Sequence, residues 1–287
     1  MSFLLAIPDA GLLTLAAFLL AAVTSTAGVS GAFLLLPLQI WVLGVAGPSV
    51  TATNLLFNLV ATPGGVFRYF REGRMLWTLA GLVALGSLPG TALGYWLRVH
   101  YLAELGRFRW IVGCVLVLVG LRMLLEALRR LSAGDRPGVA EVVDPLGLSN
   151  RRLAFSYLGE RYELRIEPLL GLSAAAGVVG GIYGIGGGAL VAPFLIWLFR
   201  LPVYAIAGAA LGATFLSSAA GVMLYWALPA PEGMTTAPDW RLGLLLGLGG
   251  LAGTYLGASL QRHVPQRFLK ALLSVVSLLA GLRFLVG

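Results

Sequence analysis

The chain carries two copies of one unit, and this internal repeat constrains the fold more than any single motif. Residues 27–70 align without a gap to residues 183–226, with 10 identical pairs in 44. Residues 77–97 align to residues 240–260 with 11 identities in 21. Three glycines spaced by four recur in these two segments, as Gly86, Gly90 and Gly94 and as Gly249, Gly253 and Gly257. A duplicated unit of this length predicts two related halves.

The composition places both halves in a lipid bilayer. Of the 287 residues, 59% are hydrophobic and 11% are charged, and the mean hydropathy is +0.90, whereas soluble domains contain about 25% charged residues. A helix needs about 20 apolar residues to cross a bilayer. The sequence therefore predicts an all-α polytopic membrane protein with 8–10 membrane segments, drawn from these apolar stretches: 11–23, 32–46, 50–67, 76–97, 110–128, 168–182, 189–199, 203–228, 241–260 and 268–286.

The arginines predict the orientation in the cytoplasmic (inner) cell membrane. Cytoplasmic loops are enriched in Lys and Arg, which puts 68–75 and 129–167 inside and, by alternation, 98–109 and 229–240 outside. About fifteen basic residues are then internal and five external, and both termini are external. Because the basic residues lie in short loops beside apolar segments, the net charge of +8 does not indicate a nucleic-acid partner.

This orientation predicts that the two repeats are inverted, since the loop after Phe67 is cytoplasmic and its counterpart after Trp226 is external. Inversion requires an odd number of crossings per repeat. Three full helices plus a broken or re-entrant helix pair satisfy this, and so do five crossings if both short arms span. The sequence leaves both arrangements open.

The predicted domain division is a first transmembrane repeat over 1–128, a cytoplasmic linker over 129–167 and a second, inverted repeat over 168–287. Within the linker, 153–166 alternates apolar and polar residues. This segment predicts either a small β-hairpin or a solvated connection.

Each repeat begins with an apolar arm that is interrupted by small and polar residues, at 24–31 and at 180–188. Lipid cannot hydrogen-bond unwound backbone, so such an interruption must be buried in protein or line a wet cavity. In transporters built from inverted repeats, paired broken helices hold the substrate, and their half-helix N-termini face anions. We therefore predict that the substrate is bound by Thr24, Ser25, Thr26, Gly28, Ser30, Gly31, Tyr183, Gly184, Gly186, Gly187 and Gly188.

The alternative is that these glycines only permit close helix packing. We assign that role to the glycines spaced by four in 86–94 and 249–257, because this spacing is typical of tight helix contacts in membranes. The two interruptions lack this regularity and cluster hydroxyl groups or consecutive glycines. That difference favours a binding site at the interruptions.

The next helix of each copy adds neutral polar side chains. Asn54 and Asn58 are spaced by four, as are Thr214 and Ser218, so each pair shares one helix face. Amide and hydroxyl groups can donate to an oxyanion without carrying charge, and we include Asn54, Asn58, Thr214, Ser217 and Ser218 in the predicted site. For the two asparagines, a hydrogen bond between helices is an equally open explanation.

No Asp, Glu, Lys, Arg or His occurs in the central stretches of the broken arms or of the helices over 50–67 and 203–228. This argues against a carboxylate-based proton-coupled mechanism. The pattern predicts no catalytic residue, no metal and no cofactor. It predicts a small anion as substrate.

These residues resemble the TauE/SafE family of sulfite exporters. The resemblance rests on the glycine-rich break followed by Pro37 or Pro193, on the run from Gly65 to Arg74 that closes on Trp77, and on the duplicated layout. It implies a transporter that moves sulfite, sulfonates such as sulfoacetate, or related sulfur oxyanions outward across the cytoplasmic membrane. Alternating access would then come from one repeat rocking against the other.

Three other functions are conceivable for such a chain. An enzyme is disfavoured, because the segment from Gly28 to Gly31 is not a Gly-x-Ser-x-Gly elbow and the two histidines, His100 and His263, lie near helix ends. An anion channel and a non-transporting membrane assembly factor remain alternatives. The sequence also leaves open whether the protein forms a homodimer.

Overall fold

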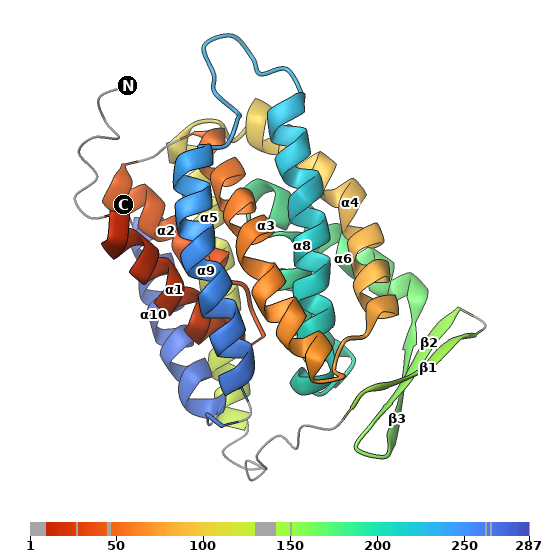
Figure 1. The fold of residues 1–287 in the computed structure, drawn as a ribbon. Coiled ribbons are helices and arrows are strands. Elements are labelled where there is room, and N and C mark those ends of the chain that lie inside the picture. The colour runs from red at the N-terminus through yellow and green to blue at the C-terminus, as the bar shows by residue number, and fades with distance from the viewer. Residues whose placement is uncertain are drawn as a thin grey trace.

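The computed structural model describes residues 10–26, 28–44, 47–129, 142–149, 151–261, 263–264 and 266–286. These residues form ten helices and three strands (Figure 1). In chain order they are α1 (Ala10–Thr26), α2 (Ala32–Leu43), α3 (Pro48–Arg71), α4 (Trp77–His100), α5 (Leu105–Arg129), β1 (Asp144–Ser149), β2 (Arg152–Tyr157), β3 (Glu160–Arg165), α6 (Ile166–Tyr183), α7 (Gly187–Leu198), α8 (Val203–Ala227), α9 (Trp240–Leu260) and α10 (Gln266–Val286).

The described part of the chain contains six helices that are long and apolar enough to cross a membrane, namely α3, α4, α5, α6, α8 and α9. The helices α1, α2 and α7 are apolar but shorter, with 17, 12 and 12 residues. The prediction of a polytopic helical membrane protein is thus confirmed in its main feature: long apolar helices combined with short ones.

The prediction that the protein is entirely α-helical is wrong over 144–165, where the chain forms an antiparallel sheet in the order β1-β2-β3. In β2 the buried side chains of Leu153, Phe155 and Tyr157 alternate with more exposed ones, so the alternation that indicated a hairpin is real. Strand β1 was not predicted, because Pro145 and Gly147 are unfavourable in strands. The register shifts between these two residues.

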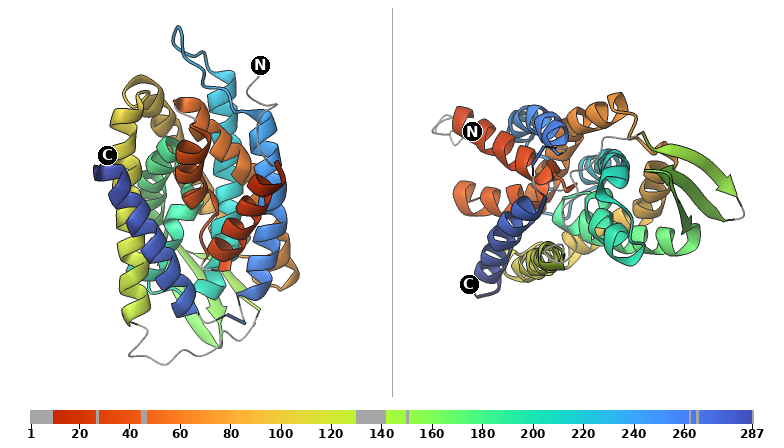
Figure 2. Two further views of the ribbon diagram at one scale, coloured as in Figure 1. Left: turned by 90° about the vertical axis from the view of Figure 1, so that its left-hand side faces the viewer. Right: turned by 90° about the horizontal axis from the view of Figure 1, so that it is seen from below.

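The helices pair across the length of the chain: α1 packs on α9, α6 on α4, and α5 on α10. Figure 2 shows α5 and α10 side by side at one edge of the bundle. A Cβ atom added to Gly253 would lie 2.3 Å from the Phe18 oxygen of α1, and one added to Gly90 would lie 2.0 Å from the Ala174 oxygen of α6. The predicted packing role of the two glycine stripes is therefore confirmed, since no larger residue fits at these crossings.

Each broken helix pair begins and ends at the same end of the bundle. In Figure 1, α1 begins and α2 ends at the upper end, whereas α6 begins and α7 ends at the lower end. The sheet and the connections 72–76 and 199–202 lie at the lower end, and the connections 101–104 and 228–239 lie at the upper end. In each pair the chain therefore turns back at the break, and the two breaks lie inside the bundle.

Candidate functional site

The two helix breaks come together inside the bundle, against α3 and α8. The Tyr183 hydroxyl, in the last turn of α6, donates to the Phe33 oxygen in the first turn of α2 at 2.8 Å. A Cβ atom on Gly184 would lie 2.6 Å from the Thr51 oxygen of α3, and one on Gly28 would lie 3.3 Å from Val203 of α8. Residues about 150 positions apart thus share one buried region.

The first break is formed by a glycine turn and a serine cap. Gly28 has a φ of +77° and its N–H donates to the Ser25 oxygen at 3.0 Å, while the Val29 N–H donates to the Thr24 oxygen at 3.1 Å. A left-handed glycine of this kind ends a helix without strain. The Ser30 oxygen then accepts from the Ala32 N–H at 3.3 Å at the start of α2, and the Ser30 hydroxyl also hydrogen-bonds the Asn58 side-chain oxygen.

The second break depends on glycine alone. Gly184 and Gly186 have φ values of +89° and +72°. A Cβ atom on Gly186 would lie 2.8 Å from the Ser218 hydroxyl oxygen and 3.1 Å from that of Ser217. The Gly187 N–H, at the start of α7, donates to the Ser217 hydroxyl at 3.0 Å. Only glycine permits this approach of the α7 N-terminus to the two serines.

Helix α3 supplies the amides. The Asn54 side-chain nitrogen donates to the Ala32 oxygen at 2.9 Å, and its oxygen accepts from Gln39 at 3.2 Å. The Asn58 side-chain nitrogen and the Ser218 hydroxyl are completely buried and have no hydrogen-bond partner among the described residues. Buried polar groups without partners are rare in folded proteins and are candidate ligand contacts.

Four predicted hydroxyls face their own helices in this structure. Thr24, Ser25, Thr26 and Thr214 donate to backbone oxygens three or four residues earlier, at 2.5–2.8 Å. Ser25 also lies against Gly257 of α9, where an added Cβ atom would be 2.1 Å from its hydroxyl. Ser25 thus belongs to the α1–α9 contact.

The two remaining predicted glycines pack against backbone. A Cβ atom on Gly31 would lie 2.9 Å from Ala21 of α1, and one on Gly188 would lie 2.4 Å from the Ala210 oxygen of α8. The structure therefore brings together Gly28, Ser30, Asn54, Asn58, Tyr183, Gly184, Gly186, Gly187, Ser217 and Ser218 around the two breaks.

The charge distribution at the breaks comes from the backbone. Helices α2 and α7 both begin there, and a helix N-terminus carries roughly half a positive charge on its free N–H groups. The segments 24–31, 54–58, 183–188 and 214–218 contain no Asp, Glu, Lys, Arg or His. The arrangement suits an anion that is held by dipoles and neutral donors.

Comparison with known proteins gives the family. The sequence profile described as "Sulfite exporter TauE/SafE" matches residues 13–284. The chain belongs to the TauE/SafE family. As a TauE/SafE protein it is a multi-pass membrane transporter and not an enzyme.

Relatives of this TauE/SafE protein carry general names. It is 26% identical to the "Probable membrane transporter protein YjnA" of Bacillus subtilis over 270 residues. This alignment covers 92% of this chain and 95% of the relative. It is 23% identical over 234 residues to the "Probable membrane transporter protein YunE" of the same species, and this alignment covers 80% of this chain and 77% of the relative. A "Probable membrane transporter protein" of Xylella fastidiosa is 26% identical over 253 residues, covering 84% and 82%. No solved structure matches the chain.

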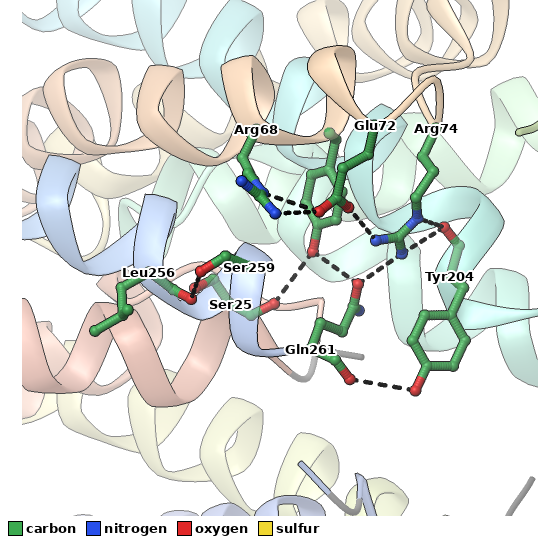
Figure 3. A network of polar contacts seen from close by, with 9 residues as sticks. Ser25, Arg68, Glu72, Arg74, Tyr204, Leu256, Ser259 and Gln261 are labelled. Atoms are coloured by element: carbon green, nitrogen blue, oxygen red, sulfur yellow. Dashed lines mark hydrogen bonds and ion pairs between the residues drawn. The ribbon is translucent and has the colours of Figure 1, made fainter. Parts of the chain in front are cut away.

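Sequence reasoning missed two buried arginines of the TauE/SafE protein. Arg74, placed in a loop by the sequence, is 1% exposed. It pairs with Glu72 at 2.9 Å, donates to the Gln261 side chain at 2.7 Å and donates to the Tyr204 oxygen at 2.8 Å (Figure 3). The same Gln261 oxygen accepts from the Tyr69 hydroxyl, 3.1 Å away. This cluster closes the lower end beneath the first break.

Arg98, predicted to begin an external loop, is completely buried in the last turn of α4. It donates to the Gly47 oxygen at 2.6 Å, to the Leu102 oxygen and to the Thr51 hydroxyl at 3.1 Å. Thr51 in turn donates to the Ile182 oxygen beside the second break at 3.1 Å. Ionisable residues at membrane depth usually mark function. The sequence signal that could have indicated these two arginines is their position near the ends of long apolar segments.

Proposed function

We propose that this TauE/SafE protein exports small sulfur oxyanions, namely sulfite or sulfonates such as sulfoacetate, by alternating access. The observation that carries the proposal is the pair of unsatisfied buried groups, the Asn58 amide nitrogen and the Ser218 hydroxyl, beside the N-termini of α2 and α7. An oxyanion offers several acceptor oxygens, and it would give these donors the partners they lack.

The neutral character of the site suits release as well as binding. A buried lysine or arginine in direct contact would bind an anion with a full charge, whereas dipoles and amides supply smaller attractions that are more easily reversed. With a negative cell interior, the membrane potential favours anion exit by about 2.3 kcal/mol per charge per 100 mV. Export therefore needs a site from which the substrate dissociates easily.

The proposal includes inverted repeats, over 1–128 and 168–287, joined by 129–167. Two features support it. In the sequence repeat α1 corresponds to α6 and α9 corresponds to α4. The packing of α1 on α9 therefore has its counterpart in the packing of α6 on α4. Tyr69 and Tyr225 align in the repeat, and their hydroxyls accordingly donate to the Ser25 and Gly181 oxygens, which also align, at 3.5 and 2.9 Å.

The proposed orientation places the lower end, with the sheet, in the cytoplasm. The arginines of 68–74 and 151–165 and Arg200 lie at this end, as the positive-inside rule requires. The N-terminus of α1 and the C-terminus of α10 then face the outside.

The direct test is efflux of radiolabelled sulfite and sulfoacetate from proteoliposomes under an imposed membrane potential. We expect saturable, electrogenic efflux that related anions inhibit by competition. The proposal fails if neither sulfite nor any sulfonate tried moves electrogenically. Unitary currents would instead identify an anion channel, and an absence of flux with normal folding would favour an assembly factor.

A binding assay with a matched variant tests the site itself. Asn58→Leu removes the unsatisfied amide, whereas Asn54→Leu removes an amide whose hydrogen bonds are already made within the bundle. If both variants fold, we expect Asn58→Leu to abolish the rise in melting temperature that sulfite causes, and Asn54→Leu to lower mainly the basal melting temperature. A sulfite response of normal size in Asn58→Leu would remove Asn58 from the site.

A further inference from the structure

A polar cavity lies between α5 and α7 at the lower end, away from the two breaks. Its volume is about 250 Å³, and its polar lining comes from Arg122, Glu126 and Arg200. The Arg122 guanidinium lies 3.6 Å from the centre of the Trp197 ring. Stacking on an indole holds a guanidinium in place while its N–H groups stay free to bind in the ring plane.

The backbone at Arg200 is unusual. Arg200 has a φ of +53°, in the left-handed region that favours glycine. The Leu201 N–H donates back to the Leu195 oxygen at 3.3 Å, as in the turn that commonly ends a helix with glycine. At the aligned position of the first repeat the chain has Gly44, with a φ of +62°. An arginine at this position costs about 1 kcal/mol of conformational strain, which indicates a role for its charge.

A second cavity, of only about 10 Å³, lies between this region and the first break. It shares Met123, Glu126 and the α7 residues Pro193 and Ile196 with the larger cavity, and it reaches Val29, the neighbour of Ser30. Lys270 of α10 also lines it and pairs with Glu126 at 2.5 Å. The Lys270 side chain is 1% exposed. The ion pair therefore lies between the larger cavity and the central site.

We propose that the larger cavity is a cytoplasmic antechamber that binds an oxyanion between Arg122 and Arg200, and that the Glu126–Lys270 pair closes its inner end. This rests on the proposed function. Among the described residues, three cationic side chains and one carboxylate line the two cavities, and this excess of positive charge suits a small anion with one or two negative charges. The ligand is an oxyanion from solution; a phospholipid phosphate has the same chemistry, and the experiment separates the two.

The first test uses three variants in proteoliposomes of neutral phosphatidylcholine. Arg200→Gly removes the charge and gives the turn its favoured residue, so it is expected to fold at least as well as the native protein. Arg122→Gln removes the second charge. Arg161→Gln, on the exposed sheet, is the control for loss of one positive charge at the same end.

We expect Arg200→Gly and Arg122→Gln each to raise the KM for sulfite on the cytoplasmic side about tenfold, the effect of losing one charge-assisted hydrogen bond, with Arg161→Gln unchanged. An unchanged KM in both variants would overturn the proposal. So would an effect that appears only in vesicles containing phosphatidylglycerol and is accompanied by loss of co-purifying phospholipid, which would assign the cavity to a lipid headgroup.

The second test does not depend on transport. In a Cys114→Ser background, which removes the single native cysteine, Val29→Cys introduces a thiol at the inner end of the small cavity. An anionic methanethiosulfonate reagent is added from the cytoplasmic side, with and without sulfoacetate. We expect slow modification that accelerates at least tenfold when Glu126→Gln and Lys270→Gln open the neck, and protection by sulfoacetate that Arg200→Gly removes.

Equal modification rates in the paired and unpaired backgrounds, together with no protection by sulfoacetate, would overturn the antechamber. If the native protein moves no sulfite but the thiol behaves as expected, the proposed function fails while the binding cavity stands. If sulfite moves normally and the thiol results are negative, only the antechamber fails.

Discussion

The two buried arginines occupy comparable positions at opposite ends of the bundle, yet their partners differ. Arg74, at the sheet end, has a carboxylate partner in Glu72 and side-chain contacts with Gln261. The described partners of Arg98, at the other end, are two backbone oxygens, the Thr51 hydroxyl and the Phe108 ring, whose centre lies 3.7 Å from the guanidinium carbon. Arg98 connects to the last turn of a broken arm through Thr51, and Arg74 does so through Gln261 and Tyr69. Arg74 thus shares the Glu72 carboxylate with Arg68, whereas the described partners of Arg98 are all neutral.

This difference suggests different tasks. Arg74, with its carboxylate partner, is expected to stabilise the proposed cytoplasmic end. Arg98 has no carboxylate partner among the described residues, and it lies next to the second break on the proposed external side. An anion leaving the central site would be attracted more strongly toward Arg98, because Glu72 offsets part of the positive charge at the Arg74 end. Four experiments test this contrast, from the largest expected effect to the smallest.

Arg74→Leu is expected to cost about 3 kcal/mol of stability, because it leaves the Glu72 carboxylate, which is 11% exposed, with one cationic partner fewer in a buried setting. The melting temperature in detergent measures this. The double variant Arg74→Leu/Glu72→Leu should recover part of the loss. If the double variant melts no higher than Arg74→Leu, the Glu72 charge does not cause the loss of stability. The proposed contrast between Arg74 and Arg98 would then be wrong.

Arg98→Gln is expected to lower the initial rate of sulfite efflux about tenfold, the size of one lost charge interaction, while Arg98→Lys retains much of the rate. Arg74→Lys is the matched control at the other end, where Glu72 already offsets part of the positive charge. The measurement is radiotracer efflux at several internal concentrations. Equal rates for Arg98→Gln and Arg98→Lys would mean that hydrogen bonding, and not charge, matters at this end.

Ser218→Ala addresses the second break. It removes a hydroxyl that has no hydrogen-bond partner among the described residues, so it should leave the melting temperature without anion nearly unchanged. Sulfite affinity is expected to fall severalfold, as one neutral hydrogen bond is worth about 1 kcal/mol. Isothermal titration of sulfite into detergent-solubilised protein measures it. A clear loss of basal stability would show that the hydroxyl has a structural role.

Tyr69→Phe and Tyr225→Phe compare the two ends directly. Each removes one buried hydroxyl that donates to a backbone oxygen of a broken arm. We expect each to cost about 1 kcal/mol in stability, with the larger effect for Tyr225→Phe, because its bond to the Gly181 oxygen is shorter. Thermal unfolding of the two variants side by side decides the order. The reverse order would indicate that the additional bond from Tyr69 to Gln261 carries more weight.

Much of the candidate site could be predicted from the sequence because membrane helices have a simple periodicity. Asn54 and Asn58 are four residues apart, and one helix face carries both toward the breaks. The glycines spaced by four predicted where α4 and α9 make close contacts, because small residues at that spacing are typical of tight helix packing in membranes.

The buried arginines and the first strand could not be predicted by the same logic. A charged residue at the boundary of an apolar segment is equally compatible with a loop, and the sequence does not tell how far a helix such as α4 continues before it ends at His100. Whether Arg98 is solvated or buried depends on the packing of α3 and α5 against that end. Strand β1 forms because β2 offers it an edge, in spite of its proline and glycine.

The absence of clearance between α1 and α9, and between α6 and α4, limits how this protein can change shape. Sliding at these crossings would drive backbone into backbone, so each pair is expected to move as one stiff body. Each of these bodies takes one helix from the first half of the chain and one from the second. The parts that move against each other during a transport cycle are therefore expected to differ from the two proposed sequence repeats, because each stiff pair combines one helix from each of them.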